Sequence, residues 1–304
     1  GSSLALGLLL KKTGIDVKIM TPNDYPEFLH WMPGQDMVIV DMKNRRDTKL
    51  WAGKANIIFL IDFNESTRLK QAETVILNSR AFKVMIDHHP NPTINADLNI
   101  SVTHLSSTAE LIYHLICGLN LHHLIDKDIA SCLFAGIMTD TGCFSYNCSY
   151  PGVFNVLAEL LSFGIDKDLI YKSVYDNYSE QRMRLMGYCM NEKMVVLPEF
   201  NTAYISLSEN ELKRFQHAPG DTEGFVNLPF SIKGIRFTAL FIEKKDHIKI
   251  SFRSRGSFAV NDFSSKYFNG GGHLNAAGGE WKQSLEHTLK RFEQLLNEFK
   301  GQLS

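Results

Sequence analysis

The chain has 304 residues, of which 44% are hydrophobic and 21% charged, a composition typical of a globular protein with more than one domain. The formal net charge of −1 excludes the broad basic surface that holds a long nucleic acid through its phosphates. No apolar run reaches the roughly 20 residues that span a bilayer, and the five scattered cysteines lack a CxxC pair, which indicates reduced thiols. We therefore expect a cytoplasmic protein that binds neither a membrane nor a long duplex.

The first half of the chain alternates short apolar runs with helical patterns. Buried strands are predicted over residues 16–20, 37–40, 56–61 and 82–86. Helices are predicted over residues 107–117, 128–138 and 153–163, and the first of them opens with the capping-box pattern of Ser107 and Glu110. This alternation predicts an α/β fold with a mostly parallel sheet and helices on both faces. In such a sheet, ligands bind outside the carboxyl ends of the strands.

The pattern changes after about Tyr178. Residues 181–192 predict a connecting helix between a first domain, residues 1–180, and a smaller mixed α+β domain, residues 193–304. Strands are predicted in the second domain over residues 193–197, 202–207, 237–243 and 248–253. Apolar residues at helical spacing predict a final amphipathic helix; they are Leu285, Leu289, Phe292, Leu296 and Phe299. We expect a cleft between the two domains.

Carboxylates and histidines stand where two of the predicted strands end. Asp62 follows the strand over residues 56–61, and Asp87, His88 and His89 follow the strand over residues 82–86. A further acid, Asp140, comes just past the predicted helix over residues 128–138. Carboxylates with an imidazole suit Mn²⁺ or a similar divalent ion. A lone acid after a strand is more often a cap or turn residue, so the interpretation depends on the conjunction of these positions.

A second signal lies near the C-terminus, where three glycines precede a histidine: Gly270, Gly271, Gly272 and His273. Successive backbone N–H groups of such a run can turn toward one anion, and a short helix from Leu274 would add its own amides. Upstream, Arg253 and Arg255 alternate on a strand pattern, which predicts that both guanidinium groups share one face and bind phosphate. A flexible hairpin with exposed arginines is the alternative interpretation.

These motifs resemble those of a known family. Asp87-His88-His89 resembles the motif that gives the DHH phosphoesterases their name, and the glycine run with His273 resembles the signature of their DHH-associated C-terminal domain. The segments around Asp62 and Asp140 resemble the other metal motifs of the family. The resemblance covers essentially the whole chain. The compact two-domain length is most similar to the nanoRNases, also called oligoribonuclease and pAp phosphatases (NrnA type).

The resemblance implies a centre with two manganese ions. Asp62 would bridge both ions, while His88 and Asp140 would hold the second one. Asp87 and His89 would be the catalytic pair, with Asp87 orienting His88 and His89 facing the substrate phosphate. The family places a histidine and two aspartates just before a small Gly-Ser-rich helix start, which Gly1 and the residues after it resemble. Most ligands of the first ion are therefore expected upstream of Gly1.

The expected activity is the hydrolysis of short oligoribonucleotides (nanoRNA), of 3′-phosphoadenosine 5′-phosphate (pAp), or of both. The near-zero net charge agrees with a substrate of one or two nucleotides or a short RNA. The alternative within the same family is a phosphodiesterase for cyclic dinucleotides or for linear pApA, which would use the same motifs. The alternative outside enzymes is a nucleotide-binding protein that has lost catalysis. A homodimer is a further expectation, because relatives often pair.

Overall fold

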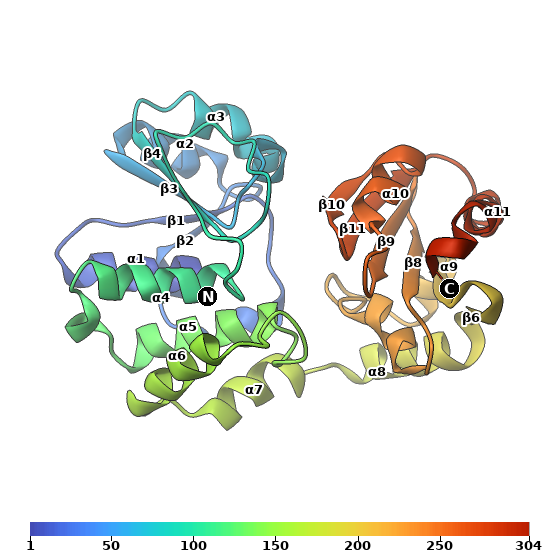
Figure 1. Cartoon of the computed structure of the whole chain (residues 1–304). Helices are drawn as coiled ribbons and strands as arrows, with labels where there is room; N and C mark the ends of the chain where they lie inside the picture. The colour runs from blue at the N-terminus through green and yellow to red at the C-terminus, as the bar shows by residue number, and fades with distance from the viewer. Residues whose placement is uncertain (304) are drawn as a thin grey trace. The chain divides into compact units, whose positions relative to one another are not determined.

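The structure is a computed structural model that describes residues 1–303 of the chain. The chain divides into two compact units, Gly1–Asn177 and Tyr178–Ser304 (Figure 1). Within the described range, no helix combines the length and the apolar character that crossing a membrane requires.

The strands of the N-terminal unit are all parallel and form two separate sheets. β1 (Ile19–Thr21) pairs with β2 (Val38–Val40). β3 (Ile57–Ile61), β4 (Phe82–Asp87) and β5 (Leu98–Ser101) form the second sheet in the order β3-β4-β5. The predicted α/β class and parallel pairing are confirmed, although the structure has two sheets where one was expected. β5 was not predicted because it is an edge strand that is largely exposed.

Helices cover both faces of the three-stranded sheet, as predicted. They are α1 (Ser2–Lys12), α2 (Arg45–Lys54), α3 (Glu73–Leu77), α4 (Thr108–Gly118), α5 (Lys127–Asp140), α6 (Pro151–Ser162) and α7 (Lys167–Tyr175). Alternate residues of β4 point to opposite faces: Met85 packs in the cluster beneath α2 and α3, whereas Val84 and Ile86 pack against α1, α4 and α5. Figure 1 shows α2 and α3 on one side of the strands and the other helices on the opposite side.

Three helices cross closely beneath the ends of the strands. A Cβ atom added at Gly136 of α5 would lie 2.6 Å from the Cβ of Ala109 in α4 and 3.5 Å from the Cα of Gly1, which precedes α1. Distances this short leave no room for a side chain at residue 136. The crossing therefore fixes the position of α5 relative to α1 and α4, and with it the position of Asp140, the last residue of α5.

The C-terminal unit is built on one mixed sheet with the strand order β10-β11-β9-β8-β7-β6. The strands are β6 (Met194–Leu197), β7 (Thr202–Leu207), β8 (Phe237–Glu243), β9 (Ile248–Ser254), β10 (Gly271–His273) and β11 (Ala276–Trp281). β7 and β8 have the predicted bounds and pair in parallel, whereas the other neighbours are antiparallel. This mixed sheet with flanking helices confirms the predicted α+β character.

The two faces of this sheet are covered differently. α10 (Val260–Tyr267) and the predicted final helix, α11 (Leu285–Leu303), cover one face over a core rich in phenylalanine, which includes Phe237, Phe241 and Phe252. On the other face, Leu240 and Ile242 pack in a smaller cluster with residues of α8 (Glu180–Tyr188) and α9 (Glu209–Arg214). That smaller cluster covers the β7 and β8 half of the second face.

The connecting segment is helical where the sequence predicted a helix. α8 passes directly into a π-helical turn, Cys189–Lys193. Arg182 of α8 is buried, and its guanidinium donates to the carbonyl oxygens of Gly220, Asp221 and Glu223. These contacts fasten α8 to the C-terminal unit.

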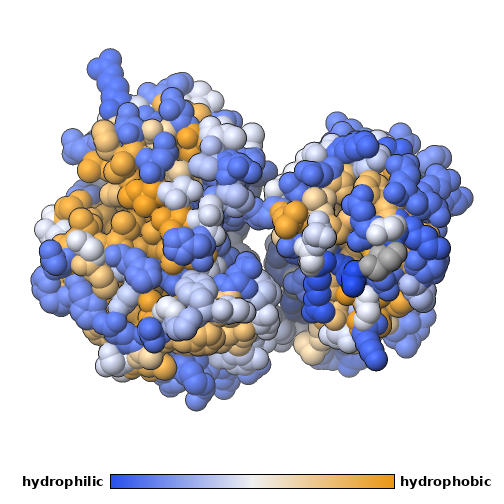
Figure 2. Space-filling view, viewed as in Figure 1, coloured by the Kyte–Doolittle hydropathy of each residue, from blue (hydrophilic) through white to orange (hydrophobic). Residues whose placement is uncertain are grey.

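Short 3₁₀ helices complete the chain at Glu27–Leu29, Gln35–Met37, Ser66–Ala72, His122–Leu124, Pro198–Phe200 and Phe225–Ser231. Figure 2 shows hydrophobic residues gathered on the visible face of the N-terminal unit. Among the exposed apolar side chains, Ile57, Phe82 and Leu98 begin three adjacent strands, at the end of the sheet opposite Asp62 and Asp87. Exposed apolar residues thus begin the three strands, whereas Asp62 and Asp87 stand at their carboxyl ends.

Candidate metal centre and anion-binding face

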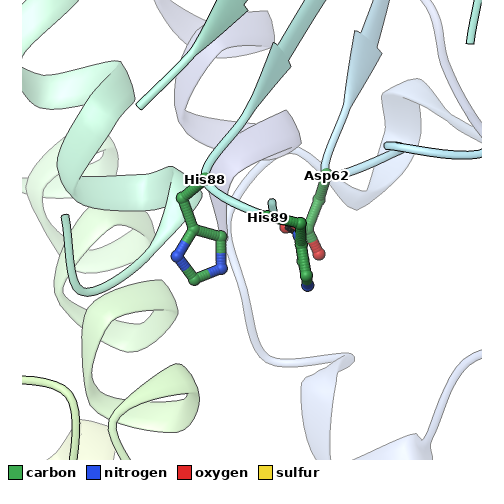
Figure 3. A group of neighbouring side chains, drawn as sticks. All are labelled: Asp62, His88 and His89. Carbon is green, nitrogen blue, oxygen red and sulfur yellow. Dashed lines mark ion pairs between the residues drawn. The ribbon is translucent and has the colours of Figure 1, made fainter. Parts of the chain in front are cut away.

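The polar residues at the carboxyl ends of β3 and β4 meet at one edge of the sheet. Ile61 and Ile86 are paired in the parallel register, so Asp62 and Asp87 follow at the same height. Asp62 has a φ of 66°, a left-handed conformation that aspartate tolerates better than most residues. Figure 3 shows the side chains of Asp62, His88 and His89 extending from the two strand ends into one space.

Each of these three side chains offers one ligand atom, and the three atoms lie within 4.8 Å of one another. Asp140 joins them from the end of α5, with its Oδ2 3.1 Å from Nε2 of His88. Nδ1 of His89 is 3.5 Å from Oδ1 of Asp62. The structure thus brings together the predicted ligands, and their carboxylate and imidazole donors suit a divalent ion such as Mn²⁺.

His88 is oriented by a backbone carbonyl. Its Nδ1 lies 3.2 Å from the carbonyl oxygen of Leu105, so Nδ1 carries the proton of this hydrogen bond and Nε2 faces Asp140. Burial lowers the pKa of His88, but the hydrogen bond and charge of Asp140 outweigh that effect and raise it to about 9. The site therefore attracts a positive charge to the position of Nε2.

Asp87 contacts a different histidine from the one that the family resemblance implied. Its Oδ1 accepts a hydrogen bond from the backbone N–H of His89 at 2.7 Å and lies 2.5 Å from Nδ1 of the same residue. Burial acts to raise the pKa of Asp87, but the bonds from His89 outweigh it, so the pKa is lowered. The prediction that Asp87 orients His88 is therefore wrong: Asp87 bonds to His89 instead. An aspartate readily bonds to the backbone two residues ahead.

Three further residues shape the site without having been predicted. Thr108 donates from Oγ1 to Oδ1 of Asp62 at 2.8 Å, and Leu105 holds His88 through its carbonyl. The backbone oxygen of Asn64 accepts from the N–H groups of Thr93 and Ile94 at 2.8 and 3.1 Å, which anchors the loop after His89. The run of serine and threonine at the start of α4 could have pointed to Thr108. Leu105 acts through its backbone carbonyl, which every residue has, so the sequence could not have indicated it.

The start of α1 lies at the same edge. A Cβ atom added at Gly1 would lie 2.7 Å from the Cα of Gly136, which is one helical turn before Asp140. The expected ligands of a first ion, upstream of Gly1, lie outside the described residues.

Strand register places three of the predicted anion-binding residues of the C-terminal unit, Arg253, Gly271 and His273, on one face. Arg253 pairs with Ala276, and Ala276 pairs with His273; directly paired residues of antiparallel strands share a face. In the neighbouring row, Ser251 pairs with Gly278 and Gly278 with Gly271. We call these residues the open face: Ser251, Arg253, Gly271, His273, Ala276 and Gly278. None of them is buried, and the floor between Arg253 and His273 consists of small residues.

The glycine run forms a hairpin strand rather than the start of a helix. The helix expected from Leu274 is wrong, because β10 ends at His273 and β11 begins at Ala276, with Leu274 and Asn275 as the turn. A Cβ at Gly270 would lie 1.9 Å from the carbonyl oxygen of Gly278, and one at Gly272, which has a φ of 145°, would lie 2.4 Å from that of Ala276.

Gly271 differs from its two neighbours, because an added Cβ there would meet nothing within 4 Å. Packing therefore explains the glycines at residues 270 and 272 but not the one at residue 271. Arg255 also differs from Arg253. It lies beyond the end of β9 at Ser254, and its guanidinium stands 4.5 Å from the ring centre of Phe230 and donates to the carbonyl of Phe230 at 3.2 Å.

The fold and the site together define an α/β protein with a cluster of carboxylates and histidines that could hold a metal ion, and with a separate mixed-sheet unit. The sequence matches the N-terminal domain of the DHH family over residues 1–137 and the DHHA1 domain over residues 204–303. The chain belongs to the DHH family of phosphoesterases, whose members depend on metal ions, and the resemblance inferred from its motifs is confirmed.

Relatives with solved structures or curated functions agree with this assignment. The crystal structure of an exopolyphosphatase-related protein from Bacteroides fragilis superposes with a TM-score of 0.96 at 41% identity, over 99% of this chain and 88% of that one. The bifunctional oligoribonuclease and PAP phosphatase NrnA of Bacillus subtilis is 29% identical over 72% of this chain and 70% of its own. The Thermus thermophilus protein of the same name is 28% identical over 95% of this chain and 84% of its own.

Proposed function

We propose that this protein is a manganese-dependent phosphoesterase that hydrolyses short oligoribonucleotides and 3′-phosphoadenosine 5′-phosphate. The observation that carries the proposal is the convergence of Asp62, His88, His89 and Asp140 at the carboxyl ends of β3 and β4. The relatives named oligoribonuclease and PAP phosphatase support the choice of substrate.

The roles of the residues follow from their contacts. Asp62, His88 and Asp140 would hold the metal, with Nε2 of His88 as the ligand atom because Nδ1 is engaged by Leu105. A bound divalent ion supplies a hydroxide at neutral pH and stabilises charge on phosphoryl oxygens. His89, held by Asp87, would face the substrate phosphate, where its imidazole can donate a hydrogen bond.

The open face would hold the rest of the substrate. Arg253 and His273 flank the floor, and guanidinium and imidazole groups bind phosphate oxygens well. Arg255 and the backbone of Gly270, Gly271 and Gly272 would complete the phosphate contacts. Small residues at the floor allow the sugar–phosphate chain of a nucleotide to lie directly on the sheet.

The metal assignment is tested by replacing His88 with alanine in the full-length protein. We expect His88→Ala to lose at least about 100-fold in kcat with Mn²⁺ on a dinucleotide, because an ion that lacks a ligand is held in the wrong position. His247→Ala is the matched control: this histidine is paired with Asp246 in a turn of the C-terminal unit, and its loss should leave kcat unchanged. Near-normal turnover by His88→Ala would rule out the metal assignment.

The substrate assignment is tested by comparing rates on pAp, a short RNA, pApA and cyclic di-AMP. Our proposal expects the highest kcat/KM on the short RNA or on pAp. A clear preference for pApA or cyclic di-AMP would replace it with the cyclic-dinucleotide alternative. Binding of these ligands without any turnover in the presence of Mn²⁺ would instead indicate a nucleotide-binding protein.

A further inference from the structure

A buried carboxylate lies in α4, two residues after Thr108, and takes no part in the roles described so far. Glu110, in the first turn of α4, is completely buried. Its Oε2 accepts hydrogen bonds from the backbone N–H of Ser106 at 2.8 Å, from the hydroxyl of Ser106 at 2.7 Å and from the hydroxyl of Tyr150. Placing a carboxylate out of water is costly, so these donors are needed to keep it there.

The contact of Glu110 departs from ordinary helix capping. In a capping box the glutamate reaches the backbone of the N-cap residue, here Ser107. Ser107 caps the helix as predicted, since its hydroxyl accepts a hydrogen bond from the N–H of Glu110 at 3.1 Å. The carboxylate instead turns to Ser106, one residue earlier, so the capping-box prediction is only half correct. Glu110 thus holds the chain before the helix.

That stretch of chain contacts two of the proposed metal ligands. The carbonyl of Leu105 takes the hydrogen bond of Nδ1 of His88, and the hydroxyl of Thr108 donates to Asp62. Ser106 lies between these two residues and is bonded by Glu110 and by Tyr150, whose hydroxyl oxygen lies 2.9 Å from the Ser106 nitrogen. Any shift of Ser106 would therefore change the orientation of both ligands together.

Tyr150 comes from another part of the unit. It is the residue that precedes α6, so its hydroxyl ties α6 to the start of α4. Burial, together with the bond to Glu110, raises the pKa of Tyr150 to about 12. The phenol therefore stays protonated and remains a hydrogen-bond donor at neutral pH.

We propose that Glu110 and Tyr150 are positioning residues for the metal centre, which hold residues 105–108 so that Leu105 orients His88 and Thr108 orients Asp62. The inference rests on the metal-dependent function proposed above. It adds a layer of side chains that touch neither metal nor substrate. Residues that orient metal ligands typically change metal affinity or activity about 10- to 100-fold when they are replaced.

Tyr150→Phe is the sharpest test, because it removes one hydroxyl and leaves the ring in place. Tyr113→Phe is the matched control: Tyr113 is buried, lies on α4, and bonds a glutamate of α6, Glu159, in a contact that does not involve residues 105–108. Mn²⁺ affinity is measured by titration calorimetry, and kcat and KM on a dinucleotide are measured separately. We expect Tyr150→Phe to weaken Mn²⁺ binding about tenfold or more and to lower kcat with little change in KM. Tyr113→Phe should change neither quantity more than about twofold.

Glu110→Gln provides a second variant, since an amide oxygen can still accept from Ser106. It should bind Mn²⁺ more tightly than Glu110→Ala does. A wild-type protein that binds no Mn²⁺ and hydrolyses nothing would overturn the proposed function and this inference with it. A wild-type protein that binds Mn²⁺, together with a Tyr150→Phe variant that binds it equally well, would overturn this inference alone. Equal losses of thermal stability in Tyr150→Phe and Tyr113→Phe without a difference in Mn²⁺ affinity would likewise reduce Tyr150 to a packing role.

Discussion

The strand ends of the N-terminal unit and the open face of the C-terminal unit are built in opposite ways. At the strand ends, each polar side chain is held by another group: His88 by Leu105, Asp62 by Thr108 and His89 by Asp87. On the open face, the floor is formed by the lack of side chains at Gly271 and Gly278, with Arg253 and His273 at its sides. A metal ion needs ligands fixed in position, whereas an extended ligand needs room against the backbone.

The largest effect should come from Asp62, the proposed bridging ligand. We expect Asp62→Asn to lower kcat about 1000-fold or more, because an amide binds divalent ions poorly and cannot bridge two of them. Asp41→Asn is the matched control, since Asp41 also follows a parallel strand, β2, but pairs with Arg45 at 3.2 Å. That variant should lose about 1–2 kcal/mol of unfolding free energy and keep its kcat, as measured by denaturation and steady-state assays.

Equal losses of kcat in the two variants would show that an acid at any strand end supports activity through the fold alone. Asp62 would then be a structural residue only, and the strand ends of the N-terminal unit would not be a metal site.

Neighbouring glycines of the run are expected to have different roles: Gly272 is required for packing, and Gly271 for ligand binding. Gly272→Ala should reduce the free energy of unfolding by about 2–4 kcal/mol, because its φ of 145° and the nearby carbonyl of Ala276 exclude a methyl group. Gly271→Ala should change it by less than about 0.5 kcal/mol, yet should raise KM for a short RNA. Chemical denaturation and steady-state kinetics measure the two effects. An unchanged KM in Gly271→Ala would mean that no ligand approaches the backbone there.

The arginines give the smallest expected effect. Arg253→Ala should raise KM about 10-fold with kcat nearly unchanged, which corresponds to the loss of one charge-assisted hydrogen bond of about 1.5 kcal/mol. Arg255→Ala should raise KM less, because the guanidinium of Arg255 is already engaged with Phe230. Steady-state kinetics on the same dinucleotide compares the two variants. A larger effect at Arg255 would move the phosphate site beyond the end of β9.

Patterns with a strong local cause could be predicted from the sequence. β7 and β8 have the predicted bounds because short, mostly apolar runs form strands that are buried on both faces. The conjunction of Asp62 with Asp87, His88 and His89 could be predicted because parallel strands bring their carboxyl ends to one edge. β5 escaped prediction because it is short and exposed, with Asn99 within it.

Other features depend on contacts that a sequence does not display. The turn at Leu274 and Asn275 looked like a helix start, but the pairing of Gly271 with Gly278 turns the chain into a hairpin. The partner of Asp87 depended on whether its side chain bends toward residue 88 or residue 89. The function of Glu110 looked like simple capping, and only the positions of Ser106 and Tyr150 show what it holds.

The crossing of α1, α4 and α5 has a consequence for tolerance to mutation. At Gly1, Ala109 and Gly136 the helices touch almost through their backbones, so their spacing there does not depend on how larger side chains pack further along. Ala109 is next to Thr108, and Gly136 is one helical turn before Asp140. Substitutions in the outer core can therefore shift the far ends of these helices. The distance between Thr108 and Asp140, which lie close to the crossing, should stay the same.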